Sequence, residues 1–390
     1  MNPVPLPITA WSVVNALGRS TAEVLRALDE GHSGLGPSPL PVTMETFVGA
    51  IPGELPPLPR AHAAYDTRLA RIGWMAFAEV REALERAVAR WGGERVAVVL
   101  GTSTGGLEQT EQAFEAWLQT GRVPERYDYQ RQHNFNALGE LLASVAGARG
   151  PVYVVSSACS SSGKVAASAG RLIRAGLADA VLIGGIDSLT RMTLQGFHSL
   201  GILSSGRCRP FGVERDGINI GEGAALLLVE RDAPSAEVVV LGVGESSDAY
   251  RMSSPEPTGR GAREAMERAL AQAGCGPGDV DHVNAHGTAT KLNDAAEALA
   301  IEALLGDRVP VSSTKGYTGH LLGGAGGTEM VFAIHAIRAG RMPATLGATP
   351  LDPEVRIQVI VEPEEGPVRR VLSNSFAFGG SNVSVLVGAA

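Results

Sequence analysis

Aromatic residues and cysteines are scarce in this 390-residue chain: Phe, Trp and Tyr together make up 5% of it, and there are 3 cysteines. Few aromatics beside 49 glycines and many alanines favour an α/β protein in which helices pack closely on a sheet. Cys159, Cys208 and Cys275 are odd in number and have no CxxC spacing, which excludes a disulfide framework and a zinc site of the usual kind. We therefore expect a cytoplasmic protein in a reducing compartment.

Excess positive charge and long apolar runs are also missing. The formal net charge of -8 argues against a general nucleic-acid binder. No apolar run approaches the length of a membrane-spanning helix, so we expect no membrane insertion. The N-terminal MNPVPLPITAWSVV has no basic segment ahead of its apolar residues, and a signal peptide is not expected. Hydrophobic residues at 44% are enough for a large core, and the length predicts two or three domains.

Strand and helix patterns alternate along the chain. Apolar, β-branched runs predict strands, and amphipathic runs between Gly-rich stops predict helices. The long helix from Asp66, its expected N-cap, to Arg90 is the clearest. The expected strands are PITAWSVV within 1–20, 95–100, 152–155, 180–184, 222–230, 238–243, 280–285, 309–313, 357–362 and 369–388. The other expected helices are 21–30, with Thr21 as its cap, 107–119, 261–273, 294–305 and 326–339. The pattern predicts an α/β fold.

Three short words recur in the same order in the two halves of the chain. VSSAC at 155–159 is matched by VSSTK at 311–315, IRAG at 173–176 recurs at 337–340, and GTSTG at 101–105 has an echo in HGTAT at 286–290. This repetition indicates a duplicated, mostly parallel α/β unit with its halves meeting near residue 240. Loops that follow its strands would then converge at one crevice. They carry Cys159, His286, the segment 315–320 and Phe378.

Cys159 lies between a predicted strand and a predicted helix that ends at Gly176. The positive end of a helix dipole favours the thiolate, which is the nucleophilic form of cysteine. Small neighbours, as in ACSSSG, leave room for a substrate. A buried structural cysteine is the alternative interpretation.

His286 and His320 both lie in loops rich in Gly and Thr, where the backbone can approach a ligand closely. A cysteine that attacks a carbonyl needs groups that stabilise the charge formed in the reaction, and two such histidines fit that need. A metal site is the rival interpretation for one cysteine and two histidines. It is weakened because the three residues are far apart and lack the usual ligand spacing.

Six stretches, in order, resemble the β-ketoacyl-acyl carrier protein synthases, which are elongating, decarboxylating condensing enzymes of the thiolase superfamily. They are SSACSSSG at 156–163, FGVERDGINIGEGAALLLVE at 211–230, SSDAYRMSSPEP at 246–257, NAHGTATKLNDAAE at 284–297, SSTKGYTGHLLGGAGGTE at 312–329 and NSFAFGGSN at 374–382. The resemblance implies a thiolase-like fold with duplicated α/β halves in a layered α-β-α-β-α arrangement. Residues 1–240 would carry the nucleophile, and residues 241–390 would carry the two histidines.

The same resemblance implies a decarboxylative Claisen condensation of malonyl-acyl carrier protein with an acyl group held on Cys159. His286 and His320 would hydrogen-bond the malonyl thioester carbonyl and stabilise the enolate that forms when carbon dioxide leaves. Backbone N–H groups of Cys159 and Phe378 would form the oxyanion hole. Lys315, paired with Glu329, would support the electrostatics of the histidines, or would be an ion pair with no chemical role.

Substrate contacts are implied in the same way. Thr288 and Thr290 would contact the phosphopantetheine arm, and Phe378 would gate the acyl pocket against Phe197, although both phenylalanines could be ordinary core residues. Ala289 and Lys291 depart from the family, which often has Ser or Gly and Pro there; Lys291 would either alter the mouth for the arm or face solvent.

Several related functions compete with this interpretation. A degradative thiolase would need a second cysteine near the C-terminus, and none follows Cys275. Starter-type synthases use Cys, His and Asn, whereas TKGYTGH supplies a second histidine here. A non-catalytic partner subunit similar to a chain-length factor would normally lack Cys159. The run CSSS is more similar to polyketide-type enzymes, and the pattern also resembles condensing enzymes of aryl polyene pathways, so fatty acid, polyketide and aryl polyene elongation all stay open.

Partners are implied by the resemblance alone. They are the acyl carrier protein and a second subunit, either an identical copy or a related ketosynthase or chain-length factor. Because the carrier is acidic, a basic docking patch is expected, with Arg68, Arg71, Arg126 and Arg131 as candidates or as a solvated face. We expect no resident metal or cofactor, since the phosphopantetheine belongs to the carrier.

Overall fold

The computed structural model describes residues 5–390. Its strands are β1 Leu6–Asn15, β2 Leu35–Pro37, β3 Phe47–Gly49, β4 Val96–Gly101, β5 Val152–Val155, β6 Ala180–Asp187, β7 Ile220–Gly221, β8 Gly223–Glu230, β9 Val238–Ser247, β10 His282–Asn284, β11 Pro310–Ser312, β12 Arg341–Met342, β13 Gln358–Val359, β14 Glu364–Glu365, β15 Arg370–Ala377 and β16 Ser381–Ala389. Its α-helices are α1 Thr21–Asp29, α2 Arg68–Trp91, α3 Leu107–Thr120, α4 Tyr129–Gln132, α5 Ala137–Ala146, α6 Ser161–Arg174, α7 Arg191–Ser199, α8 Arg260–Ala273, α9 Lys291–Leu305, α10 Lys315–Thr318 and α11 Ala325–Ala339. Short 3₁₀ turns lie at Arg60–Tyr65, Gly93–Arg95, Pro277–Asp279 and Leu322–Gly324.

Eleven strands form one sheet in the order β13-β11-β10-β15-β16-β9-β1-β8-β6-β4-β5. With β13 set aside as an extra strand beside β11, the two halves of this order repeat each other. Counted along the chain, each half places its five strands as third, second, fourth, fifth and first. In each, the second strand is parallel to two neighbours and the last two pairings are antiparallel. The sheet is therefore mixed, and the expectation of a mostly parallel sheet is wrong for its pairings. The fifth strand of each half, β8 or β16, runs against the other four and pairs antiparallel with both neighbours, and β1 pairs antiparallel with β9.

Strands β1 and β9 join the two halves, with Leu6 opposite Val240 and Ile8 opposite Val238. The repeated strand order supports a division near residue 240, which stays a prediction as a domain boundary.

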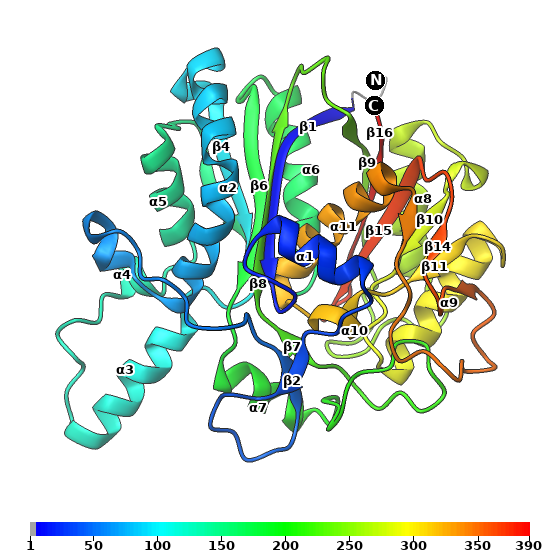
Figure 1. Ribbon diagram of the computed structural model, residues 1–390, viewed down its shortest axis with the longest axis horizontal. Coiled ribbons are helices and arrows are strands. Elements are labelled where there is room, and N and C mark those ends of the chain that lie inside the picture. Colours follow the sequence, from blue (N-terminus) through cyan, green and yellow to red (C-terminus); the bar gives the residue numbers. More distant parts are fainter. Residues whose placement is uncertain (1–4) are drawn as a thin grey trace.

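Five layers are visible across the molecule (Figure 1). Helices α2 and α5 cover the outer side of the first half-sheet, and α8 covers that of the second, with α9 packed on α8. Helices α6 and α11 lie between the half-sheets and contact strands of both. The layered α-β-α-β-α arrangement is thus confirmed.

Three apolar clusters hold these layers together. The central cluster includes Val165 of α6 and Phe332 of α11 and draws residues from both half-sheets. One outer cluster lies under α2 and α5, and the other lies under α8 and α9. Burial of this much apolar side chain is the main stabilising contribution, and it fixes the strand ends that carry the site.

Helix starts differ in detail from the expectation. Thr67, not Asp66, is the N-cap of α2: its side chain accepts a hydrogen bond from the N–H of Ala70. Asp66 instead pairs with Arg71 at 2.7 Å. The N-cap of α1 is Ser20, one residue ahead of the expected Thr21.

The glycine-rich turn after β4 is a packing turn. Buried Asp187 accepts hydrogen bonds from Thr102 Oγ1 at 2.6 Å and from the backbone N–H groups of Ser103 and Thr104. It also accepts from the N–H of Gly323 at 2.7 Å, which ties this turn to the segment just after His320.

Within residues 5–390, no helix combines the length and apolar character needed to cross a bilayer.

Candidate active site

Cys159 lies in the tight connection between β5 and α6. Ala158 has a φ of 51°, a backbone conformation that non-glycine residues seldom adopt and that is typical of functional turns. Ser161 stabilises this turn, since its hydroxyl donates to the carbonyl of Ala158 at 2.6 Å and accepts from the N–H of Ser157 at 2.9 Å. The turn places the cysteine side chain, 7% exposed, at the inner end of a cavity.

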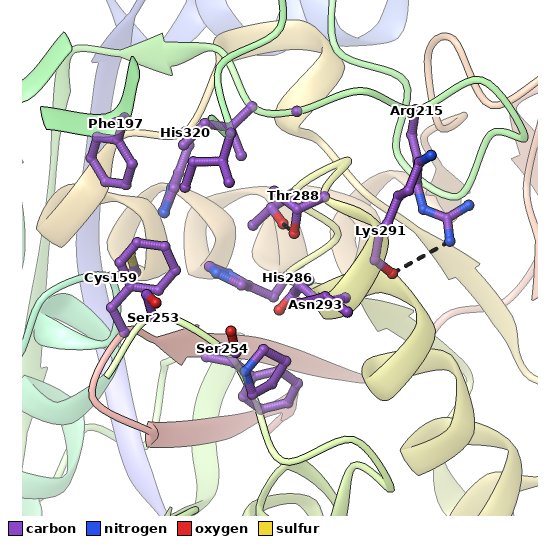
Figure 2. Close-up of a pocket in the computed structure, with 18 of the residues that line it drawn as sticks. Cys159, Phe197, Arg215, Ser253, Ser254, His286, Thr288, Lys291, Asn293 and His320 are labelled. Atoms are coloured by element: carbon purple, nitrogen blue, oxygen red, sulfur yellow. Dashed lines mark hydrogen bonds between the residues drawn. The ribbon is translucent and has the colours of Figure 1, made fainter. Parts of the chain in front are cut away.

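His286 follows β10 and His320 follows α10, and the two rings lie 5.1 Å apart, nearly perpendicular at 84°. The Cys159 sulfur and one nitrogen of each histidine all lie within 4.8 Å of one another. Figure 2 shows the three side chains facing the same space, from elements far apart in the sequence. The structure therefore brings Cys159, His286 and His320 together, as the sequence predicts.

Burial sets the protonation of this group. It raises the pKa of the Cys159 thiol to about 12, against smaller opposite effects from Lys315 and from hydrogen bonds with the backbone N–H groups of Cys159 and Phe378. It lowers the pKa of His286 and His320 well below the ordinary value, and Lys315 acts in the same direction. The resting site thus holds a neutral thiol between neutral imidazoles. The expected thiolate is wrong for this state, because desolvation outweighs the helix dipole.

The backbone N–H groups of Cys159 and Phe378 are near the Cys159 sulfur, since both act to lower its pKa against the larger effect of burial. Phe378 comes from the turn between β15 and β16, as the sequence suggests.

Lys315 and Glu329 form a buried ion pair beside the histidines, with each side chain 3% exposed. Glu329 lies on α11 and Lys315 opens α10, so the pair connects the central helix layer to the loop of His320. Burial raises the pKa of Glu329, and its partner Lys315 opposes that shift.

Glu297 is a site residue that we did not single out in the sequence. Its carboxylate accepts hydrogen bonds from the N–H groups of His286 and Gly287, each at 2.8 Å, and from the side-chain amide of Asn374 at 3.2 Å. Ser313 adds a bond from its hydroxyl to the carbonyl of Gly287 at 2.7 Å. The one available signal was its place in α9, an acidic residue on a helix that starts directly after the histidine loop.

A cavity of about 520 Å³ opens from Cys159 toward the surface. It is lined by the four residues expected to contact substrate, Phe197, Thr288, Thr290 and Phe378. The rings of Phe197 and Phe378 lie 5.8 Å apart beside the cysteine.

The cavity is also lined by residues to which the sequence analysis gave no role, namely Arg215, Ser253, Ser254, Asn293 and Asn382. Lys291, which departs from the family pattern, is exposed and lines the same cavity.

The donor set of one thiolate and two imidazoles could also suit a divalent metal. Here the Lys315 ammonium is near enough to lower the pKa of both histidines, and such a charge opposes a cation between them. The wide spacing in sequence, by contrast, was no argument against a metal, because folding brings the three residues together.

Two of the arginines considered for docking are engaged within the fold. Arg68 pairs with buried Glu222, and Arg71 pairs with Asp66. Arg131 pairs with Asp128 at 2.8 Å on the surface. Of the four candidates, Arg126 alone has no ion pair among residues 5–390, so these side chains do not form a free basic patch.

Comparisons with known proteins agree with this site. The "Beta-ketoacyl synthase, N-terminal domain" family model matches residues 5–235, and the "Beta-ketoacyl synthase, C-terminal domain" model matches residues 237–349. Nodulation protein E of Rhizobium meliloti is 33% identical over 391 residues, 96% of each chain. 3-Oxoacyl-[acyl-carrier-protein] synthase 2 of Mycobacterium bovis is 35% identical over 310 residues, 75% of this chain and 74% of the relative.

Solved structures agree as well. The ketosynthase ApeO from Xenorhabdus doucetiae, in complex with its chain length factor ApeC, has a TM-score of 0.93 and 36% identity, covering 99% of this chain and 98% of that one. A β-ketoacyl synthase from Burkholderia phymatum has a TM-score of 0.88 and 29% identity, covering 100% of both chains. The thiolase-like ketosynthase fold is thereby confirmed. The chain belongs to the β-ketoacyl synthase family of acyl-transferring condensing enzymes.

Proposed function

We propose that this protein condenses malonyl-acyl carrier protein with an acyl group held on Cys159, releasing carbon dioxide and a β-ketoacyl-acyl carrier protein. The observation that carries the proposal is the gathering of the Cys159 sulfur and the His286 and His320 nitrogens within 4.8 Å. Such a group can hold an acyl chain on sulfur while two N–H donors face the second substrate.

Acyl transfer is the first step. The Cys159 sulfur attacks the carbonyl carbon of an acyl thioester on the carrier, and the thiol proton ends on the sulfur of the departing phosphopantetheine. Because the resting thiol is neutral, a neutral imidazole nearby accepts the proton as the carbon–sulfur bond forms. The backbone N–H groups of Cys159 and Phe378 stabilise the tetrahedral oxyanion.

Condensation follows. His286 and His320 donate N–H bonds to the malonyl thioester carbonyl, so that loss of carbon dioxide leaves an enolate stabilised by both. The enolate carbon attacks the acyl carbonyl on Cys159, the carbon–sulfur bond breaks, and the released thiolate takes up one proton. Burial keeps both histidines neutral. Their nitrogens therefore carry no positive charge, which would otherwise hold the malonyl carboxylate in place. Lys315 and Glu329 maintain this electrostatic setting.

Two measurements on intact protein test the proposal. With acyl carrier protein bearing acyl chains, the mass of the protein should rise by one acyl group, and the adduct should map to Cys159. With malonyl carrier, Cys159→Ala should release carbon dioxide without condensing, whereas His286→Ala and His320→Ala should lose that release. A wild-type protein that never forms an acyl adduct would instead favour the alternative, a non-catalytic subunit resembling a chain-length factor.

A partner subunit and the pathway belong to the same proposal. ApeO is paired with a chain length factor in its solved structure, and so is the ishigamide ketosynthase, with a TM-score of 0.91 and 26% identity. Exposed apolar side chains on α3, Phe114, Trp117 and Leu118, at 56%, 44% and 64%, suit an interface with such a chain. We propose a heterodimer, in a reducing cytoplasm, that extends a polyene or polyketide chain. Native mass spectrometry of the protein alone and with a co-expressed chain length factor distinguishes a homodimer from this heterodimer.

A further inference from the structure

Lysine is rare in this protein: the sequence has three lysines against thirty arginines. Two of the three have carboxylate partners, since Lys164 of α6 lies 3.7 Å from Glu245 and Lys315 is buried against Glu329. Lys291 is exposed, and among residues 5–390 no carboxylate oxygen lies within 4.0 Å of its ammonium. It is therefore the one lysine free to meet a ligand.

Lys291 lines the same cavity as Cys159. In Figure 2, Cys159 and Lys291 lie on opposite sides of the view, with His286 and Thr288 between them. Its exposure places Lys291 at the outer part of the cavity, whereas Cys159 is buried at the inner part. A long substrate that reaches the sulfur through this cavity can contact the ammonium.

The other cation close to Lys291 is neutralised. Arg215 pairs with Asp352 and lies 3.9 Å from Asp294, and it also bonds the carbonyl of Lys291 at 3.5 Å. Its charge is therefore balanced within the fold.

The acidic residues lining this part of the cavity are also partnered. Glu214 and Asp216 lie 3.0 Å and 3.6 Å from the guanidinium of Arg209. One guanidinium thus serves both of these carboxylates, whereas the ammonium of Lys291 has no carboxylate oxygen within 4.0 Å among residues 5–390.

The backbone adds to this preference. Lys291 is the first residue of α9, whose fifteen residues direct their positive dipole end at the mouth. The N-cap Thr290 makes no side-chain bond to the first turn, and its hydroxyl pairs with that of Thr288 at 3.0 Å. N–H groups of the first turn are therefore not capped by Thr290, and an anion there would meet both these groups and the ammonium.

From these observations, and resting on the proposed function, we infer that Lys291 binds the phosphate of the carrier protein's phosphopantetheine arm. The arm carries its thioester at one end and its phosphodiester at the other, which matches a buried thiol and an unpaired surface cation along one cavity. A flexible ammonium suits a phosphate that arrives and leaves in every cycle. Lys291 would thus set the preference for phosphorylated substrates without taking part in bond making.

Substrates with and without the phosphate test this assignment. Lys291→Gln should raise the KM for S-malonyl-phosphopantetheine by about threefold to tenfold, as expected for the loss of one exposed charge-assisted contact, and leave kcat unchanged. The KM for S-malonyl-pantetheine, which lacks the phosphate, should not change. Lys291→Arg should restore most of the preference, and Lys164→Gln is the matched control, since Lys164 lies outside the cavity. An equal effect on both substrates, or on neither, would overturn the inference.

A labelling experiment decides the question even if the protein condenses nothing. A succinimidyl ester should modify Lys291 faster than Lys164 or Lys315, which mass spectrometry of peptides resolves. Free phosphopantetheine should protect Lys291, and pantetheine should not; equal protection by both would contradict a phosphate contact.

Coenzyme A presents the same phosphate chemistry as the carrier arm. Malonyl-acyl carrier protein and malonyl-coenzyme A should therefore be compared in Lys291→Gln. A KM increase with the carrier supports the assignment, and an increase confined to coenzyme A overturns it.

Discussion

The carboxylate of Glu297 holds the loop of His286 by its backbone: one oxygen accepts the N–H of His286 at 2.8 Å, and the other accepts the N–H of Gly287 at 2.8 Å. Gly287 has a φ of 38°, so the loop adopts a conformation that depends on these bonds. Burial raises the pKa of Glu297 to about 7. A single buried acid on α9 therefore positions a histidine of the site.

Glu297→Gln should lower the rate of malonyl decarboxylation, because the new amide group would face one of the two N–H donors. Leaving one of these buried N–H donors without an acceptor should also cost about 1–3 kcal/mol of unfolding free energy. Stopped-flow kinetics or carbon dioxide release measures the rate of decarboxylation, and thermal unfolding measures the change in stability. Glu302→Gln on the same helix is the control, and equal activity in both variants would refute a positioning role for Glu297.

The same residue makes a prediction about pH and stability. Since burial raises the folded-state pKa of Glu297 above its ordinary value, the native protein binds this proton more tightly than the unfolded chain. Its contribution to stability is present below about pH 4.5 and lost as pH rises through about 7, on the order of 3 kcal/mol. The unfolding free energy of the wild type, measured with denaturant, should fall more steeply across this pH range than that of Glu297→Gln. Parallel curves of unfolding free energy against pH would contradict the raised pKa.

How far the sequence predicts this site depends on which interactions are local. The Cys159 turn and the two histidine loops follow strand patterns, so their convergence could be predicted from topology. The protonation of Cys159 could not, because desolvation comes from side chains of other elements. Likewise, Arg68 looked like a surface cation and instead meets Glu222, which lies 154 positions further along the chain. Periodicity says nothing about such a pair.

Alkylation of Cys159 should report its raised pKa. Because the thiolate fraction of a thiol with a pKa of about 12 grows throughout the alkaline range, the iodoacetamide rate should rise about tenfold per pH unit from about pH 7 to pH 10. A small free thiol should level off above its pKa of about 8.5 under the same conditions. Peptide mass spectrometry follows the modification of Cys159 itself. A plateau below pH 9 would show that the helix dipole, and not burial, dominates the resting thiol.

Removing one member of the buried Lys315–Glu329 pair should be costly. Lys315→Met leaves the Glu329 carboxylate uncompensated and should lower the unfolding free energy by about 3–5 kcal/mol. Replacing both, as Lys315→Met with Glu329→Leu, should recover much of that loss, which denaturant unfolding can measure. If the double variant is no more stable than Lys315→Met, the loss comes from packing and not from the unpaired charge.

Activity should separate a chemical role of Lys315 from a structural one. Lys315 lowers the pKa of both His286 and His320, so these pKa values should rise in Lys315→Met. The acidic limb of the pH profile for carbon dioxide release should then move to higher pH, because the imidazoles must be neutral. An unchanged limb, with only a lower maximum, would leave Lys315 with a structural role alone.

Phe197 and Phe378 should set the size of the acyl group that reaches Cys159. Their rings lie 5.8 Å apart in the cavity wall, Phe197 on α7 and Phe378 on the β15–β16 turn. Phe197→Ala removes one ring of this pair and leaves the backbone N–H of Phe378 in place, so the oxyanion donors remain. We expect longer or bulkier acyl adducts on Cys159 when the variant competes for a mixed pool of acyl carriers, with decarboxylation unchanged. Intact-mass distributions measure this directly. Met192→Ala on the same helix, whose side chain is 64% exposed, is the control, and identical adduct distributions in all three proteins would show that Phe197 does not limit the acyl group.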